Sequence, residues 1–163
     1  MKVPFIDLKR AHDPIKSELL EAFSSTIDHG GFCLGKDVEQ FELEFAKVQG
    51  VSRCVGLGSG TEALHLIACA MGIGRGDEVI VPAFTFIASA WFAQYVGARP
   101  VFLDIDPDSY TLDPNSIEAA ITDKTRAIVV THLFGQSAEM DTILNIARSK
   151  GIKVVEDAAQ AHL

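Results

Sequence analysis

Ile152-Lys153-Val154-Val155-Glu156-Asp157, near the carboxyl end of the chain, is a short apolar run followed by two acidic residues. Gly151 precedes it, and such a run is typical of a buried parallel strand that is entered from a helix. Ligands of open α/β sheets bind outside the carboxyl ends of the strands. Glu156 and Asp157 are therefore candidates for binding or catalysis.

Strand-like and helical segments alternate upstream of this stretch. The predicted strands cover residues 53–57, 78–81, 100–104, 126–131 and 152–155, and the predicted helices cover residues 61–71, 86–96, 116–121 and 140–150. Short β-rich runs separated by helices imply βαβ crossovers. The sequence therefore predicts an α/β domain over residues 51–163, with a mainly parallel sheet and helices on both faces.

Residues 1–50 lack this alternation and are predicted to form an extended arm and two helices. Pro14 can occupy the first turn of a helix, and apolar residues follow it at helical spacing as far as Ile27. The glycines of His29-Gly30-Gly31 can adopt the left-handed geometry that ends a helix. A second apolar stripe predicts another helix over residues 38–48, which Gly50 ends.

Length and composition indicate a globular protein. The chain has 163 residues, of which 48% are apolar, enough for one core. Its net charge of −8 argues against nucleic acid or an anionic membrane as the main partner. The three cysteines fit neither a disulfide framework nor a metal site, and predict reduced thiols in a cytoplasmic protein. The charged amino-terminal residues form no signal-peptide core.

One stretch has the length of a membrane span. Residues 79–98 are twenty residues without a charge. Pro82 and Gln94 interrupt this stretch, and its start resembles the end of a strand. We therefore interpret it as a buried strand, turn and helix, and expect no association with membranes.

The loop Gly58-Ser59-Gly60-Thr61 precedes a predicted helix and suits a phosphate group. Its glycines allow a ligand to approach the backbone, and the start of a helix offers free N–H groups with partial positive charge. The loop lacks the lysine of a Walker A motif and the third glycine of a dinucleotide fingerprint. A capped tight turn, with Thr61 near the N-cap, is the alternative interpretation.

Three further features follow predicted strands. Residues 82–89 contain two aromatic side chains that suit stacking on a planar ring, or simply packing in the core. Asp157 suits a protonated ring nitrogen, or is a surface acid or helix cap. His132 and His162 fit a structural role as well as a functional one.

A phosphate cradle, an aromatic residue and an acid at the carboxyl ends of parallel strands could all contact one ligand. A phosphorylated, planar ring that contains nitrogen satisfies all three. Pyridoxal 5'-phosphate is the simplest cofactor of this kind.

These motifs resemble the amino-terminal part of the DegT/DnrJ/EryC1/StrS family of aminotransferases, which depend on pyridoxal phosphate and act on nucleotide-linked keto sugars. The resemblance covers essentially the whole chain, and it is carried by residues 4–8, 35–42, 58–64, 82–89, 132–141 and 155–162. It implies a partial large domain of the type I aminotransferase fold and a homodimer with the site at the interface.

The resemblance also implies roles for individual residues. Gly60 and Thr61 would bind the cofactor phosphate, and Phe86 would stack on the pyridine ring. Asp157 would pair with the pyridine nitrogen. The two remaining cofactor-binding residues would be Gln160, near the ring hydroxyl, and Ser89, close to the cofactor.

The Schiff-base lysine of the family lies beyond the Asp157-Ala158-Ala159-Gln160 motif, and none of the eight lysines of this chain matches its position. We therefore expect no catalytic residue and no transamination from these 163 residues alone. The complete enzyme would transfer an amino group from an amino acid, by expectation glutamate, to a nucleotide-linked keto sugar in surface-polysaccharide or related biosynthesis.

Three other functions are compatible with the sequence. A dehydratase of the same family carries histidine in place of the lysine. A non-catalytic protein would be a truncated remnant or a dimerisation partner of a full-length homologue. An unrelated phosphate-binding α/β domain would require the series of motifs to be coincidental.

Overall fold

The computed structural model describes residues 3–162, which fall into two compact units that divide between Gly56 and Leu57. The first unit contains α1 (Leu8–His12), the 3-10 helix η1 (Asp13–Ile15), α2 (Lys16–His29) and α3 (Lys36–Val48). The second contains α4 (Gly60–Ala70), β1 (Glu78–Pro82), α5 (Ala88–Gln94), β2 (Arg99–Leu103), α6 (Pro114–Ala120), β3 (Thr125–Thr131), the 3-10 helix η2 (Leu133–Gly135), α7 (Met140–Lys150) and β4 (Lys153–Asp157).

Capping residues mark the start of α1 and the end of α2. The carboxylate of Asp7 accepts a hydrogen bond from the N–H of Arg10 and caps α1. This short helix starts before Pro14, where the sequence predicted the first helix to open. Gly30 ends α2 in the left-handed conformation, with φ of 66°, as the sequence predicted.

The sequence prediction of a strand over residues 53–57 is wrong. In the described part of the chain this segment belongs to no ladder, and its backbone is irregular. A β-rich composition favours a strand only where a neighbouring strand takes up its backbone hydrogen bonds. Instead, the N–H of Gly56 donates to the Glu42 carboxylate of α3 at 2.7 Å.

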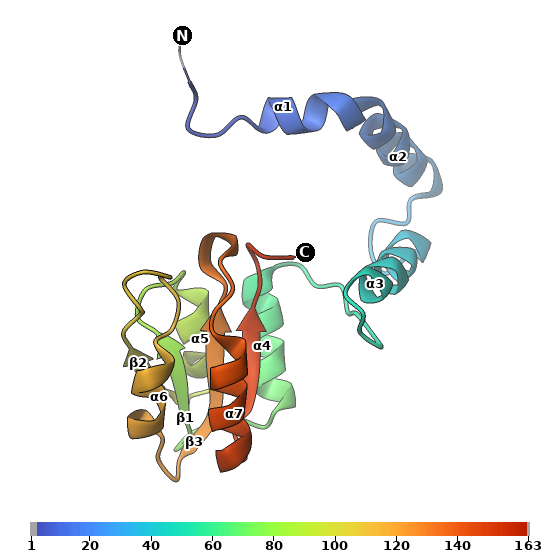
Figure 1. The fold of residues 1–163 in the computed structure, drawn as a ribbon. Helices are drawn as coiled ribbons and strands as arrows, with labels where there is room; N and C mark the ends of the chain where they lie inside the picture. Colours follow the sequence, from blue (N-terminus) through green and yellow to red (C-terminus); the bar gives the residue numbers. More distant parts are fainter. Residues whose placement is uncertain (1–2, 163) are drawn as a thin grey trace. The chain divides into compact units, whose positions relative to one another are not determined.

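The second unit is built on a parallel sheet with the strand order β2-β1-β3-β4 (Figure 1). The register between β3 and β4 pairs Thr131 with Asp157, the last residue of each strand. β4 therefore extends two residues beyond the predicted end at Val155. The carboxyl ends of these strands form one edge of the sheet.

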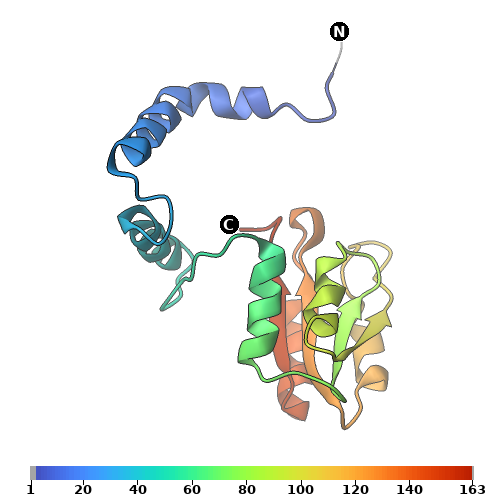
Figure 2. The same cartoon turned by 180° about the vertical axis from the view of Figure 1, so that it is seen from behind.

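Helices cover both faces of this sheet, which confirms the predicted architecture. α4 and α5 pack on one face, where alternate strand residues such as Val79 and Val81 belong to one buried cluster with Phe92. α6 and α7 pack on the other face, against residues such as Ile80 and Ile128 (Figures 1 and 2). Successive strand residues point to opposite faces, so a strand covered on both sides is apolar throughout.

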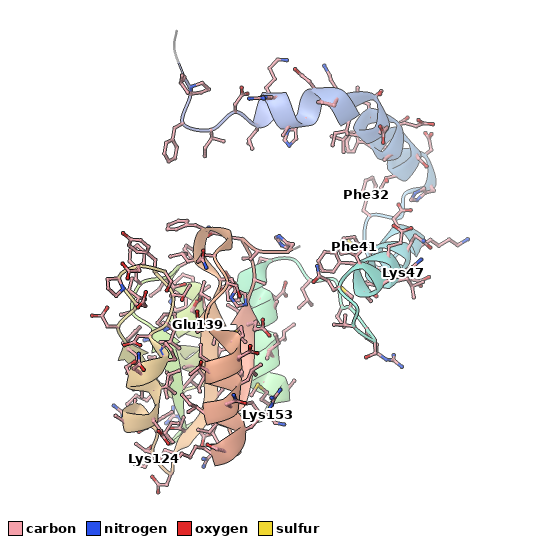
Figure 3. The ribbon with its side chains drawn as sticks, viewed as in Figure 1. Phe32, Phe41, Lys47, Lys124, Glu139 and Lys153 are labelled. Atoms are coloured by element: carbon pink, nitrogen blue, oxygen red, sulfur yellow. The ribbon has the colours of Figure 1, made fainter. Side chains whose placement is uncertain are left out.

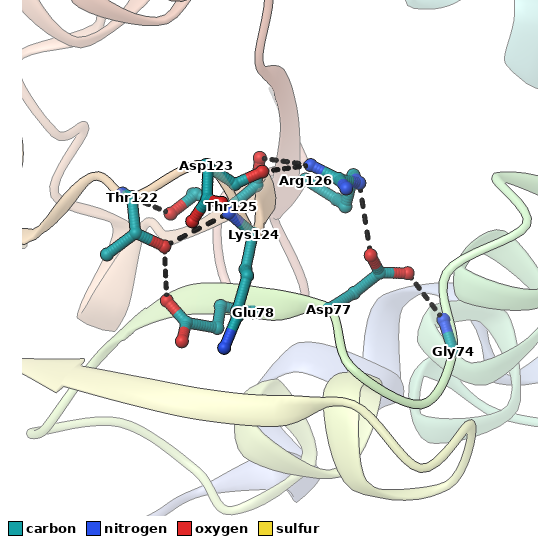
Figure 4. Close-up of polar contacts among 8 residues, drawn as sticks. All are labelled: Gly74, Asp77, Glu78, Thr122, Asp123, Lys124, Thr125 and Arg126. Atoms are coloured by element: carbon teal, nitrogen blue, oxygen red, sulfur yellow. Dashed lines mark hydrogen bonds and ion pairs between the residues drawn. The ribbon is translucent and has the colours of Figure 1, made fainter.

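A polar network joins the strands at the amino edge of the sheet. Glu78, at the start of β1, accepts hydrogen bonds from Arg99 Nη2 at 2.6 Å and Thr122 Oγ1 at 2.8 Å. Asp77 Oδ1 pairs with Arg126 Nε at 3.0 Å, beside the Thr122 contact (Figure 4). The hydrogen bonds from Arg99 and Thr122 lower the pKa of Glu78, and the bond from Arg99 is the largest cause.

Residues 79–98 form β1, a turn and α5, as predicted from the interruptions in their apolar pattern. Among the described residues, every helix is too short or too polar to cross a membrane.

Candidate cofactor site

A cavity of about 330 Å³ lies at the carboxyl edge of the sheet, within the second unit. Its walls come from the start of α4, the loop after β1, the end of β3 with η2, and the end of β4. The residues that line it are Gly60, Thr61, Leu64, Thr85, Phe86, Ala88, Thr131, His132, Leu133, Asp157, Ala159 and Gln160.

The start of α4 presents backbone donors to this cavity. Ser59 is the N-cap and accepts from the N–H of Glu62 at 3.2 Å, while the Glu62 carboxylate accepts from the N–H of Gly58 at 2.9 Å. The N-cap is therefore Ser59, and Thr61 lies two residues after it. Within residues 3–162 the N–H groups of Gly60 and Thr61 have no hydrogen-bond acceptor. They are free to bind an anion at the positive end of the helix.

Open space adjoins this helix start. A Cβ atom added at Gly60 would meet no protein atom within 4 Å, whereas one at Gly58 would lie 2.8 Å from the Glu62 carboxylate. Gly58 therefore accommodates the Glu62 carboxylate of the cap, and Gly60 leaves room beside the free N–H groups.

Phe86 forms an apolar wall of the cavity. Its side chain is 64% exposed, although the ring also contacts Trp91 of α5. An aromatic ring in a cavity wall suits stacking against a flat ligand. Phe84, which the sequence could not distinguish from Phe86, lies against Tyr110 and does not line the cavity.

Asp157 brings a carboxylate to the same cavity. Its Oδ2 atom accepts from Ser89 Oγ at 3.2 Å, and its Oδ1 atom accepts from the N–H of Ala159 at 3.3 Å. Ser89 is fully buried and contacts Thr131 Oγ1 at 3.1 Å. Thr85 Oγ1 donates to Thr131 Oγ1 at 3.0 Å.

Gln160 is held by the turn that follows β3. Its Oε1 atom accepts from the N–H of Phe134 at 2.7 Å. Phe134 has a left-handed backbone, with φ of 58°, and Gly135 follows with φ of 85°. Because Oε1 is occupied, the amide nitrogen of Gln160 is the group available to a ligand.

His132 is buried, and hydrogen bonds fix its ring. Nδ1 accepts from the N–H of Ala138 at 3.2 Å, so the ring proton is on Nε2, which lies 2.9 Å from Glu156 Oε2. Both ring nitrogens are occupied, so His132 holds residues 132–138 against β4. This arrangement supports the structural interpretation of His132.

Five of the six predicted cofactor-binding residues line the cavity. These are Gly60, Thr61, Phe86, Asp157 and Gln160. Ser89 is not in the wall and lies behind Asp157. No role was predicted for Thr85, which lies in the motif of residues 82–89, or for Thr131, which ends the strand predicted over residues 126–131. A hydroxyl residue at the end of the strand predicted over residues 126–131 was the one available signal for Thr131.

No lysine belongs to the residues that line the cavity. Lys124 and Lys153 lie at the amino ends of β3 and β4, and Figure 3 shows both away from the end of the unit where the chain enters α4. Among the described residues that form this cavity, none can therefore supply an amine to a cofactor.

Comparisons with known proteins agree with one another. The model of the DegT/DnrJ/EryC1/StrS aminotransferase family matches residues 13–163. A UDP-2-acetamido-2-deoxy-3-oxo-D-glucuronate aminotransferase of Pseudomonas aeruginosa is 43% identical over 98% of this chain and 44% of its own length. A dTDP-3-amino-3,4,6-trideoxy-alpha-D-glucose transaminase of Streptomyces venezuelae is 45% identical over 99% of this chain and 42% of its own length.

Solved structures show the same similarity. The crystal structure of DesV from Streptomyces venezuelae has a TM-score of 0.95 and 45% identity, over 99% of this chain and 43% of that one. NtdA from Bacillus subtilis, solved with bound PMP, has a TM-score of 0.93 and 34% identity, over 98% of this chain and 37% of that one. The chain thus spans less than half the length of these relatives.

Proposed function

The chain belongs to the DegT/DnrJ/EryC1/StrS aminotransferase family, and on that basis we propose that residues 57–163 contribute the pyridoxal phosphate site of a nucleotide-sugar aminotransferase. The reaction would move an amino group from an amino acid, expected to be glutamate, to a nucleotide-linked keto sugar. One observation carries this proposal: the free N–H groups of α4, the Phe86 ring and the Asp157 carboxylate meet at one cavity.

The donors and acceptors present fit each part of the cofactor. The N–H groups of Gly60 and Thr61, with the Thr61 hydroxyl, would hold the phosphate. Phe86 would stack on the ring, and the amide nitrogen of Gln160 would donate to the ring hydroxyl. The carboxylate of Asp157 would accept a hydrogen bond from the protonated ring nitrogen and keep the proton there.

When bound, the cofactor would supply an electron sink for the reacting carbon. The chain's own contribution is to bind and orient the ring and to hold its proton. The resemblance places the lysine that bonds to the cofactor after Gln160, in a part of the relatives that this chain does not span. We accordingly propose that cofactor binding by the chain alone is non-covalent and weak.

The substrates and the oligomeric state are also proposed from membership of the aminotransferase family. The relatives are named for UDP- and dTDP-linked sugars, which supports a nucleotide-linked sugar as the amino acceptor here. A homodimer and a cytoplasmic location are the assembly and compartment that we expect for such an enzyme. No nucleic acid partner is expected, given the net charge of −8.

Equilibrium titration of the 163-residue chain with pyridoxal phosphate tests the proposed site. We expect saturable binding that weakens by about ten- to a hundredfold in Asp157→Ala, because a hydrogen bond to a charged group is lost. Asp141→Ala, a substitution in the first turn of α7 and outside the cavity, is the matched control and should bind like the wild type. Absence of wild-type binding at millimolar cofactor would contradict the proposal.

A further inference from the structure

We propose that Thr85 and Thr131 are positioning residues, which act through Ser89 to hold the Asp157 carboxylate in one orientation. The consequence for the cofactor rests on the function proposed above, whereas the positioning itself belongs to the chain alone. Three hydroxyl groups from separate parts of the sequence meet behind the carboxylate, and their hydrogen bonds have a definite direction.

That direction follows from the chemistry of the groups. An ionised carboxylate only accepts, so the hydroxyl proton of Ser89 is donated to Asp157 Oδ2, 3.2 Å away. Ser89 can then only accept from Thr131, whose Oγ1 lies at 3.1 Å. Because Thr131 donates its hydroxyl proton to Ser89, it can only accept from Thr85, whose Oγ1 lies 3.0 Å from Thr131 Oγ1. Donation runs in one direction, from Thr85 through Thr131 and Ser89 to Asp157.

Burial and register make this series of hydroxyls rigid. The side chain of Ser89 is fully buried and Thr131 is 8% exposed, so water does not compete at the centre of the series. Thr131 and Asp157 are paired positions on neighbouring parallel strands. Their side chains therefore leave the sheet on the same face, toward α5 and Ser89.

The arrangement differs from ordinary packing of hydroxyl residues. A serine in a helix commonly returns its hydrogen bond to a carbonyl one turn earlier, but Ser89 donates to a carboxylate that is 68 residues away. Hydrogen bonds in such a series polarise one another, and the last acceptor carries a charge. Replacement of the threonines should therefore affect the carboxylate and not only local packing.

Thr85 can also donate a hydrogen bond directly to Ser89, and the experiment must remove this second donor as well. Its Oγ1 atom also lies 3.2 Å from Ser89 Oγ, so Thr85 can donate directly to Ser89 once the Thr131 hydroxyl is lost. Thr131→Val alone should have a partial effect. The double variant Thr85→Val/Thr131→Val removes both donors and nearly preserves side-chain shape. Thr131→Ser retains the hydroxyl and is the matched control.

The first measurement uses the 163-residue chain without cofactor. Three-bond NMR couplings report the χ1 rotamer of Asp157, and hydrogen exchange reports the N–H of Ala159, which donates to Oδ1. We expect one rotamer in the wild type and in Thr131→Ser, partial averaging in Thr131→Val, and full averaging in the double variant and in Ser89→Ala. Exchange at Ala159 should accelerate about three- to tenfold in the double variant.

The second measurement compares pyridoxal phosphate with its 1-deaza analogue, in which a C–H group replaces the ring nitrogen. The double variant should weaken the binding of pyridoxal phosphate about three- to tenfold more than it weakens the binding of the analogue. If the wild type binds neither ligand, the proposed function is wrong, and the NMR couplings still decide the positioning.

A folded double variant that keeps a single Asp157 rotamer would overturn the inference. If the double variant does not fold, Thr131→Val and Thr131→Ser decide it, because equal couplings in both would contradict the partial averaging expected when the Thr131 hydroxyl is lost. Averaging that appears in Thr131→Val and is reversed in Thr131→Ser supports the inference.

Discussion

The indole of Trp91 lies edge-on against the ring of Phe86, with centroids 6.4 Å apart and planes inclined at 77°. Trp91 is the only tryptophan of the chain, and Phe86 lines the cavity at the carboxyl edge of the sheet. We therefore expect the fluorescence of Trp91 to report on the occupancy of the proposed site.

Phe86→Ala should weaken the binding of pyridoxal phosphate by about two- to tenfold, the contribution of a stacked aromatic pair. The bound cofactor should quench Trp91 emission by energy transfer, and this quenching gives the affinity. Phe86→Tyr keeps the ring and should bind like the wild type. Equal affinity in the alanine variant would show that the cofactor does not stack on Phe86.

Gly60→Ala should affect folding and binding differently. Free space surrounds the new Cβ atom, and alanine favours a helix, so the free energy of unfolding should stay constant or rise by up to about 1 kcal/mol. Affinity for pyridoxal phosphate should fall, because the methyl group occupies the space beside the free N–H groups. Pyridoxal, which lacks the phosphate, is the control ligand, and an equal loss for both would place the phosphate elsewhere.

Gln160→Ala should loosen the turn after β3. The N–H of Phe134 would lose its acceptor, and its hydrogen exchange should accelerate by about tenfold, the value of one hydrogen bond. Gln160→Glu retains an acceptor and should keep exchange slow, yet it should bind the cofactor less well because it lacks the donating amide. Slow exchange in the alanine variant would mean that Gln160 does not hold the turn.

Glu78→Gln should lower the free energy of unfolding at neutral pH. It should also make this free energy depend less on pH in the acidic range. The pKa of Glu78 is lowered below 4.5 in the folded chain by Arg99 and Thr122. Because the pKa of Glu78 is lower in the folded chain, its ionised carboxylate stabilises the fold fully above pH 4.5, the pKa in the unfolded chain. This stabilisation is lost as the pH falls through the pKa of the folded chain.

Urea unfolding between neutral and acidic pH, followed by Trp91 emission, tests this dependence. The difference between wild type and Glu78→Gln should shrink as the pH falls through the folded pKa of Glu78. Glu118→Gln, which removes the exposed α6 carboxylate that pairs with Lys150 at 3.4 Å, is the control and should follow the wild type closely, because an exposed ion pair contributes little to stability. A difference that does not change with pH would exclude the charge of Glu78 as the cause.

Local signals in the sequence were sufficient for most elements of the fold. The apolar stripe of α3, the buried run of β1 and the left-handed glycine after α2 follow from residues close together in the chain. The strand predicted over residues 53–57 was wrong because a strand depends on its neighbour, which local composition does not specify. α1 was missed because its cap, Asp7, lies within the amino-terminal arm that was predicted to be extended.

Part of the site could likewise be inferred before the structure. Gly60, Thr61, Phe86, Asp157 and Gln160 were singled out from motifs and family resemblance, and all line one cavity. The sequence alone determined these residue types. It also placed Gly60 and Thr61 at the start of a helix, and Phe86, Asp157 and Gln160 at or after the ends of strands, because apolar runs, glycines and acids are local features.

Only the tertiary structure decided how the distant hydroxyls are connected. Thr85 and Thr131 are 46 residues apart, and Ser89 and Asp157 are 68 residues apart. Their contacts arise because β3 and β4 are paired in one register and α5 packs across them. The direction of a buried hydrogen bond depends on which groups the fold brings within about 3 Å, and no periodicity in the sequence encodes that distance.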